Sequence, residues 1–260
     1  MPIALIVDDE PAANELLAML MELRGYATES AFTGAEAIAM LDRHDYDVIL
    51  LDLMLPDMSG YRVCESVKTR KQTTLIPVIM VTARVAAENR AESFALGADG
   101  YIGKPYTPDQ LFEAVSEAEA WRRKTRAEPD DGNSRVHFAA NDDDESLRRL
   151  SQLRSEVFSQ TPLPIDAVQR VDEALRAIRH DAAAWARARG VSSVATVDFR
   201  ALDDRMILTL RDQSGWLSDP SRPPAARCAK AIERAGFDAI STDLASGTLT
   251  LVKGFTNATT

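Results

Sequence analysis

The first half of the chain alternates short apolar runs with longer stretches in which apolar residues recur every three or four positions. Short apolar runs are typical of buried strands, and the three-to-four spacing is typical of amphipathic helices. The expected strands are Ile3–Val7, Ala27–Phe32, Asp47–Asp52, Pro77–Thr82 and Gly100–Ile102. The expected helices are Pro11–Arg24, Ala35–Arg43, Gly60–Arg70, Ala87–Leu96 and Pro108–Lys124. Five successive strand–helix units predict an α/β fold, a doubly wound parallel sheet with helices on both faces.

The pattern changes in the second half. Two helical stretches, Leu147–Gln160 and Ile165–Arg189, are divided by "TPLP". The β-like runs "SVATVDFR" and "RMILTLRD" then flank the turn "ALDD", which predicts an antiparallel hairpin. A helix at Ala225–Ala235 leads into a further strand pair, "FDAIST" and "GTLTLVKGF". These elements predict a second α+β domain with a mostly antiparallel sheet packed on helices.

A polar stretch separates the two halves. Residues 125–145, "TRAEPDDGNSRVHFAANDDDE", are broken by Pro and Gly and end in a run of acids. This composition favours a linker. The expected organisation is therefore a first domain over residues 1–124, the linker, and a second domain over residues 146–260.

Composition limits the classes of partner. The chain has 260 residues and a net charge of −10, and nearly all of the acidic excess lies in the first half. An acidic domain is a poor surface for nucleic acid. No apolar run approaches the roughly 20 residues that span a bilayer, and no secretory signal is expected, so we expect a cytoplasmic protein without a membrane partner. Cys64 and Cys228 have no Cys or His at metal-ligand spacing and are expected to be reduced core thiols.

Polar groups follow four of the five expected strands. Asp8 and Asp9 follow the first strand, Asp52 closes the third, Thr82 closes the fourth and Lys104 follows the fifth. The carboxyl ends of parallel strands meet at one edge of a sheet, where such proteins place their working residues. Two or three carboxylates suit Mg²⁺, and an ammonium with a hydroxyl can hold phosphoryl oxygens. Asp52 could then act as a nucleophile that carries an acyl phosphate.

These residues resemble the response-regulator receiver family of two-component signalling. The matching motifs are "VDDEP", "LLDLMLPDMSG", "VTA" and "GKP", and the resemblance covers roughly residues 2–122. It implies the sheet order 2-1-3-4-5 and a cis Lys104–Pro105 bond. It also implies Mg²⁺ held by Asp8, Asp9 and Asp52, with Asp52 as the phosphorylated residue and Thr82 and Lys104 acting beside it.

The resemblance implies a mechanism and its partners as well. A phosphohistidine on a kinase or phosphotransferase would donate to Asp52, and Thr82 with the switch aromatic Tyr101 would then rearrange. Met54 and Arg84 would flank the site and tune the loss of the phosphoryl group. A downstream protein partner is expected, and the family also allows a homodimer through this domain.

The second half resembles, through fewer residues, the ATP-binding fold shared by histidine kinases and anti-sigma-factor kinases. The matching stretches are "VDEALRAIRHDA", "LTLRDQSGWL" and "SGTLTLVK". Asp172 stands in the family's acidic position, but Arg176 stands where the family has a Mg²⁺-binding Asn, a role that an arginine cannot fill. In the glycine box only Asp212 is retained, because Ser214 and Trp216 replace its glycines. Gly247–Thr248 matches the last motif.

These departures predict a degenerate domain that neither hydrolyses ATP nor acts as a kinase, and that signals by binding protein. A DNA-binding output with a divergent winged helix is the alternative, and a generic α+β domain is a third interpretation. The helix Ile165–Arg189 is long for a winged helix, which clusters short helices before its hairpin. His180 is expected to be a surface or capping residue.

Overall fold

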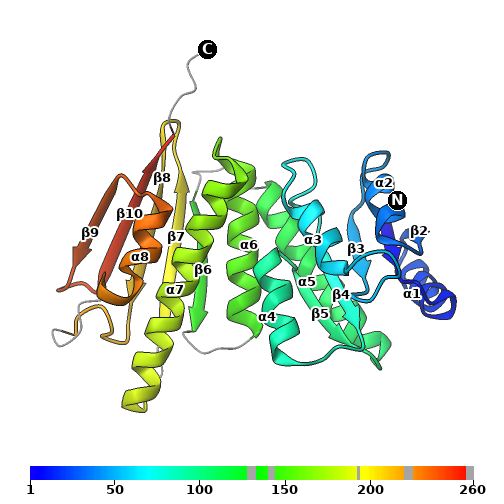
Figure 1. The fold of residues 1–260 in the computed structure, drawn as a ribbon, viewed down its shortest axis with the longest axis horizontal. Coiled ribbons are helices and arrows are strands. Elements are labelled where there is room, and N and C mark those ends of the chain that lie inside the picture. Colours follow the sequence, from blue (N-terminus) through cyan, green and yellow to red (C-terminus); the bar gives the residue numbers. More distant parts are fainter. Residues whose placement is uncertain (128–132, 140–143, 192–193, 220–224, 256–260) are drawn as a thin grey trace. The chain divides into compact units, whose positions relative to one another are not determined.

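The computed structural model describes residues 1–127, 133–139, 144–191, 194–219 and 225–255. The chain divides into two compact units, Met1–Ala127 and Glu128–Thr260 (Figure 1). Each unit has its own sheet.

The first unit is a parallel sheet with the predicted order β2-β1-β3-β4-β5. Its strands are β1 (Ile3–Val7), β2 (Ala27–Ala31), β3 (Val48–Leu51), β4 (Val78–Thr82) and β5 (Gly100–Gly103). The helices that connect and follow them are α1 (Pro11–Leu23), α2 (Gly34–Leu41), α3 (Gly60–Lys68), α4 (Ala87–Leu96) and α5 (Pro108–Ala127). The α/β prediction for this half is confirmed.

The central strands of this sheet are buried on both faces. Every residue of β3 and β4 is buried, as expected when helices cover a parallel sheet on each side. On one face, Leu17 and Met21 of α1 and Leu111 of α5 join Ile6 and other strand residues in one apolar cluster. This packing leaves only the strand ends free to carry polar chemistry.

A buried ion pair lies where β4 and β5 begin. The Lys68 ammonium is 2.8 Å from a carboxylate oxygen of Asp99 and donates to the carbonyl oxygens of Thr74 and Ile76. Lys68 is 2% exposed and Asp99 1%. The Asp99 carboxylate also accepts the backbone N–H of Val78. These bonds join the end of α3 to the start of β4 and β5, at the edge opposite the polar strand ends.

The second unit contains a five-stranded antiparallel sheet in the order β6-β7-β8-β10-β9. Its elements are β6 (Asn133–Ala139), α6 (Asp144–Gln160), α7 (Ile165–Arg189), β7 (Val194–Ala201), β8 (Arg205–Asp212), α8 (Ala225–Ala235), β9 (Ala239–Asp243) and β10 (Thr248–Gly254). Helices α7 and α8 lie against one face of the sheet (Figure 1). Residues of all three helices pack with inward residues of β7, β8 and β10 in one core. The α+β prediction is confirmed.

The expected linker differs from the structure. Residues 125–145 were expected to be irregular, but α5 continues to Ala127 and β6 forms at Asn133–Ala139. β6 pairs antiparallel with β7, from Asn133 opposite Arg200 to Ala139 opposite Val194. A strand that pairs with a partner far along the chain depends on tertiary contacts that local composition does not reveal.

Two other expectations concern the described chain as a whole. Among the described helices, none combines the length and apolar composition needed to cross a membrane. Cys64 and Cys228 are both free thiols and both buried, as predicted.

Candidate functional site

The structure brings the predicted polar groups of the first unit to one edge of its sheet. Asp8 and Asp9 follow β1, Asp52 follows β3, Thr82 ends β4 and Lys104 follows β5. Because β1, β3, β4 and β5 are parallel neighbours, these ends lie side by side. The predicted grouping of these five residues is what the geometry shows.

Three carboxylates face one another there. Asp8, Asp9 and Asp52 each offer an oxygen, and these oxygens lie within 4.8 Å of one another. Asp8 and Asp52 are buried, whereas Asp9 is exposed. Three hard oxygen donors that leave room for water and a phosphate oxygen fit Mg²⁺.

Lys104 supplies the positive charge beside these acids. Its ammonium lies 2.6 Å from a carboxylate oxygen of Asp8 and 3.3 Å from one of Asp52. Burial lowers the pKa of Lys104, but the Asp8 hydrogen bond and the Asp52 charge outweigh it, so the pKa lies above its usual value. Lys104 is therefore a fixed cation that lies beside both Asp52 and Asp8.

Asp8 itself is held in an unfavourable environment. Burial raises its pKa above the usual value, although the Lys104 hydrogen bond and the Glu10 amide act in the opposite direction. The Glu10 N–H donates to Asp8 at 3.1 Å. A carboxylate kept partly desolvated in this way gains from any further cation placed beside it.

The two residues expected to switch, Thr82 and Tyr101, are both hydrogen-bonded to the backbone of Arg84. Thr82 is fully buried, and its hydroxyl oxygen accepts the N–H of Arg84 at 3.3 Å. The Tyr101 hydroxyl donates to the carbonyl oxygen of Arg84. Burial raises the pKa of Tyr101 to about 12, so its hydroxyl remains a donor at neutral pH. Both groups therefore contact Arg84.

The loop after Asp52 is held by a close backbone contact that sequence reasoning missed. A β-carbon at Gly60, the first residue of α3, would lie 2.1 Å from the carbonyl oxygen of Asp52. The Gly60 N–H donates to the carbonyl oxygen of Leu53, and Met54 forms a bridge with Ser59. The motif "LMLPDMSG" contained the signal, since only glycine allows such an approach.

Asp57 fastens the same loop to another helix. Its two carboxylate oxygens accept the N–H groups of Gly34 and Ala35 at the start of α2, at 2.8 Å and 2.9 Å. The Ala35 and Gly34 amides hold the pKa of Asp57 below its usual value. The loop is thus held in two places: Gly60 of α3 is bonded to Leu53, and Asp57 is bonded to the start of α2.

Asn14 supports the acidic edge from beneath. It is 1% exposed on the apolar face of α1, and its amide nitrogen donates to the carbonyl oxygens of Asp8 and Ala31, both at 3.3 Å. The bond holds the ends of β1 and β2 together. The only sequence signal for this role was that Asn14, a polar residue, stands at helical spacing from Leu17 and Met21 on the apolar face of the helix.

A recess opens beside Asp52. It has a volume of about 370 Å³ and is lined by Leu53, Met54, Leu55, Met58, Ser59, Tyr61 and Arg84. Met54 and Arg84, the two expected flanking residues, both line it. Met54 is 53% exposed, so it can contact a molecule that approaches Asp52.

Comparison with known proteins identifies the family of the residues that form this edge of the sheet. The family model described as the response regulator receiver domain matches residues 4–116. These residues are a response regulator receiver domain. The Lys104–Pro105 bond of the receiver domain is cis, as the resemblance implied.

The receiver domain also has named relatives. It is 43% identical over 111 residues to "Transcriptional regulatory protein ResD" of Bacillus subtilis, a match that covers 43% of this chain and 45% of that protein. It is 36% identical over 115 residues to "DNA-binding dual master transcriptional regulator RpaA" of Synechocystis, covering 44% of this chain and 48% of that protein. The chain thus spans less than half the length of these relatives.

A solved structure is similar over the same region. The CheY-like receiver domain protein of Methanospirillum hungatei is 34% identical, with a TM-score of 0.45, and the match covers 48% of this chain and 98% of that chain. The family match that identifies the receiver domain stops at residue 116.

In the second unit, the carboxylate of Asp212 is occupied by its own loop. It accepts the N–H and hydroxyl of Ser214 and, through its other oxygen, the N–H of Leu217 at 2.8 Å. Trp216, which stands between these residues, is 3% exposed and donates from its indole nitrogen to Asp181 at 3.1 Å. The loop is therefore closed by its own side chains.

The other motif positions are also used internally. Arg176 donates from Nε to a carboxylate oxygen of Asp172 at 2.7 Å. A β-carbon at Gly247 would lie 2.7 Å from the carbonyl oxygen of Asp212, so this glycine allows β8 and the start of β10 to approach. His180 is exposed on α7, as expected of a surface residue.

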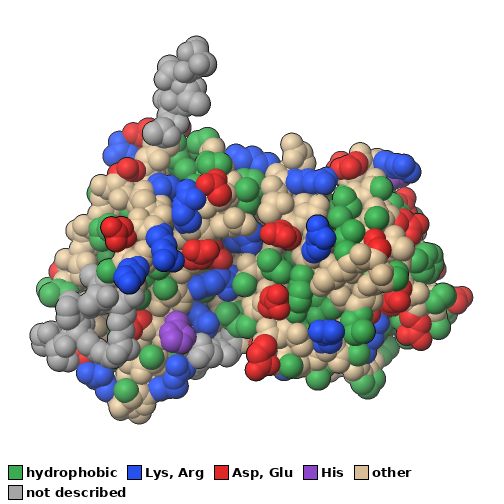
Figure 2. Space-filling view, in the orientation of Figure 1, with side chains coloured by type: hydrophobic (Ala, Val, Ile, Leu, Met, Phe, Trp, Pro, Cys, Tyr) green, Lys and Arg blue, Asp and Glu red, His purple; other side chains and the backbone are tan. Residues whose placement is uncertain are grey.

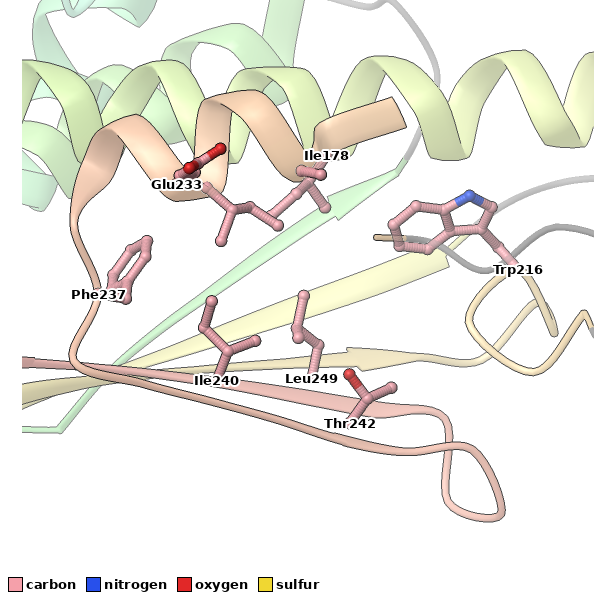
Figure 3. A pocket seen from close by; sticks show the side chains of 9 residues that line it. Ile178, Trp216, Glu233, Phe237, Ile240, Thr242 and Leu249 are labelled. Carbon is pink, nitrogen blue, oxygen red and sulfur yellow. The ribbon is translucent and has the colours of Figure 1, made fainter. Parts of the chain in front are cut away.

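An apolar pocket lies between the helices and the sheet of this unit. Its volume is about 360 Å³, and Figure 3 shows the side chains that line it. They come from α7, α8, the segment that connects α8 with β9, the strands β9 and β10, and the Asp212 loop. The lining residues are Ile178, Trp216, Ala229, Ile232, Glu233, Phe237, Ile240, Thr242 and Leu249.

Proposed function

We propose that the protein is a response regulator switched by Mg²⁺-dependent phosphorylation of Asp52, and that its second unit signals by binding another protein. The observation that carries the first part is the position of Lys104, whose ammonium lies beside both Asp52 and Asp8. A nucleophilic carboxylate needs such a fixed cation to accept a phosphoryl group that carries several negative charges.

In the proposed transfer, a carboxylate oxygen of Asp52 attacks the phosphorus of a phosphohistidine on the partner kinase. The O–P bond forms, the P–N bond breaks, and the imidazole of the donor leaves. Lys104 and the Thr82 hydroxyl hold the phosphoryl oxygens on the acyl phosphate that results. Asp8, Asp9 and Asp52 are the residues that would hold Mg²⁺, which when bound supplies positive charge against the phosphoryl oxygens.

The proposed switch begins at Thr82. In the unphosphorylated structure the Thr82 hydroxyl accepts the Arg84 N–H. A phosphoryl group on Asp52 attracts this hydroxyl away from that position. Because Tyr101 donates to the Arg84 carbonyl, movement of the segment around Arg84 changes the position of the ring. A local charge thereby biases the surface formed by α4, β5 and α5.

Labelling with a small phosphodonor such as acetyl phosphate tests this proposal. With Mg²⁺ the full chain should gain one acid-labile phosphoryl group, and Asp52→Asn should gain none. Asp42→Asn provides the matched control, because Asp42 is exposed, pairs with Arg70 outside the site and should leave labelling in place. Wild-type labelling of Asp52→Asn would contradict the assignment.

The second unit is proposed to have the scaffold of a histidine-kinase-like ATPase without its activity. The supporting observations are the Asp212 carboxylate closed by Ser214 and Leu217, and the buried Trp216. Glycines at such loops let backbone approach phosphates, whereas the Trp216 side chain fills that space. Arg176 pairs with Asp172 instead of offering a metal ligand.

Calorimetric titration of ATP into the full chain, with and without Mg²⁺, tests this part. No heat of binding is expected in either buffer. Micromolar, Mg²⁺-enhanced binding that the Asp212→Asn variant loses would overturn the proposal and support a kinase.

Direct DNA binding is the second candidate, because the relatives ResD and RpaA are described as transcriptional regulators. Those matches reach only the receiver domain, so they give no information on the second unit. Basic and acidic side chains are interspersed on the face shown in Figure 2, and no continuous basic field appears there. Promoter-fragment binding with a steep salt dependence and a response to phosphorylation would favour this candidate.

A further inference from the structure

Among the described residues, the second sheet has no strand beyond β9. This strand ends the sheet order, and its one strand partner among the described residues is β10. All five residues of β9 are exposed. An edge strand presents N–H and C=O groups that only another extended backbone can pair along their whole length.

β9 lacks the usual devices that protect an edge. Proteins often place proline or lysine on exposed edge strands, and the sequence of β9, "AISTD", contains neither. Its one charged residue, Asp243, stands at the end of the strand, where its carboxylate accepts the N–H of Ala245. The outer edge is therefore available to a further strand.

The apolar pocket adjoins this edge. Ile240 and Thr242 of β9 point from the strand toward α8, as does Leu249 of β10 (Figure 3). Ile240 is 52% exposed and Leu249 5%, so the pocket becomes more enclosed with distance from β9. Alternate side chains of a strand point to the same face of its sheet. A strand added beside β9 would therefore place every second side chain at the mouth of this pocket.

One free charge lies at the same place. Glu233 of α8 lines the pocket and is exposed, and its carboxylate has no hydrogen-bond or ion-pair partner in the described part of the chain. A basic residue on the added segment would complement it.

We propose that β9 and the adjoining pocket bind an extended segment of a partner protein. The segment pairs with the outer edge of β9, inserts an apolar side chain between β9 and α8, and carries a basic residue near Glu233. This mode combines backbone pairing for affinity with a side-chain pocket for specificity. The inference rests on the proposed protein-binding function and specifies its binding mode.

Defined peptides test the mode of binding. The probe is a labelled octapeptide of alternating Leu and Thr that ends in Lys, measured by fluorescence anisotropy with the full chain. Two further versions are N-methylated, one on each alternate set of amides. The unmodified peptide should bind, and only the version methylated on the set that faces β9 should weaken, by about tenfold for two or three lost hydrogen bonds.

Two matched substitutions locate the binding site. Ile240→Lys should weaken the peptide about tenfold or more, because burial of one large apolar side chain contributes on that order. Val191→Lys makes the same change at a residue that is 46% exposed and lies outside the pocket, so it should change affinity less than about twofold. Hydrogen exchange should slow at β9 amides when the peptide is bound.

Any of four results would overturn the inference. One is equal binding of both N-methylated peptides and the parent, and another is equal binding to Ile240→Lys and wild type. The third is a concentration-dependent dimer that Ile240→Lys dissociates, because the occupant of the edge would then be a second copy. If a partner captured by the phosphorylated protein binds Ile240→Lys as well as wild type, the protein-binding function stands and this mode fails.

Discussion

Gly60 and Asp52 approach so closely that a β-carbon at Gly60 would lie 2.1 Å from the carbonyl oxygen of Asp52. The contact fixes the backbone from which the proposed nucleophile projects. The obstructing atom belongs to the backbone and not to a flexible side chain, so a larger residue must displace the loop.

We therefore expect Gly60→Ala to slow phosphoryl labelling of Asp52 and to lower stability by about 1–3 kcal/mol, the usual cost of overpacking. Gly25→Ala is the control, since a β-carbon there meets nothing within 4 Å and its strain comes from a φ of +87°. Stability is measured by urea unfolding and labelling by acetyl phosphate. Normal labelling of Gly60→Ala would show that this contact does not position Asp52.

The raised pKa of Asp8 predicts a stability that falls as pH rises. The folded protein holds a proton on Asp8 more tightly than the unfolded chain, whose usual value is 3.8. The stabilisation that this proton gives the folded state is fully present below the usual pKa of aspartate, and it is lost as pH rises through the pKa of Asp8 in the folded state. In Mg²⁺-free buffer at pH 7, Asp8→Asn should therefore be more stable than wild type, and the gain should disappear in acid.

Urea unfolding at pH values from about 3.5, just below the usual aspartate pKa, to about 7 would measure the difference in stability between Asp8→Asn and wild type. Asp9→Asn is the control, because Asp9 is exposed. A pH-independent difference between Asp8→Asn and wild type would contradict the prediction.

The buried Lys68–Asp99 pair predicts asymmetric costs. Lys68→Met or Asp99→Asn alone leaves a buried charge or polar group without its partner, and each should cost about 3–5 kcal/mol. The double variant should cost less than the two single variants together. Arg70→Met breaks an Arg70–Asp42 pair whose side chains are 39% and 63% exposed, and it should cost less than about 1 kcal/mol. Additive effects of the two core substitutions would contradict the pairing.

Trp216 is expected to act as a core residue of the second unit. Trp216→Ala should cost about 3–5 kcal/mol because it leaves a cavity at a side chain that is 3% exposed. Trp216→Phe should cost less, since it keeps most of the packing and loses the hydrogen bond to Asp181. Neither variant should gain ATP binding, because Asp212 remains closed by its loop. A gain of Mg²⁺-dependent ATP binding would identify Trp216 as the blocking group.

The receiver half could be predicted because its signals are local and repeated. Apolar runs marked the strands, and the polar residues at the ends of four strands marked the edge where Asp8, Asp52 and Lys104 meet. The supporting contacts could not be predicted in the same way. Asn14 contacts the carbonyl of Ala31 only after β2 has paired with β1, and the approach of Gly60 to Asp52 depends on how the loop between them folds.

The strand β6 shows why the second half was harder. Its sequence alternates polar and apolar residues over Arg135–Phe138, which is a strand signal. Pro129, Gly132 and the run of acids around it favour a linker more strongly. The pairing with β7 decides the outcome, and that information lies more than fifty residues further along the chain.

That pairing also bears on synthesis of the protein. β6 leaves the ribosome before the two helices that separate it from β7, and its first hydrogen-bonding neighbour in the sheet is β7. At about 5–20 residues per second, translation needs several seconds to reach Val194 after Ala139. During that interval the receiver domain upstream can already be complete, while the nascent second unit holds a strand without a neighbour. The period in which the nascent chain is open to misassociation therefore comes after the receiver domain has folded and before β7 has been synthesised.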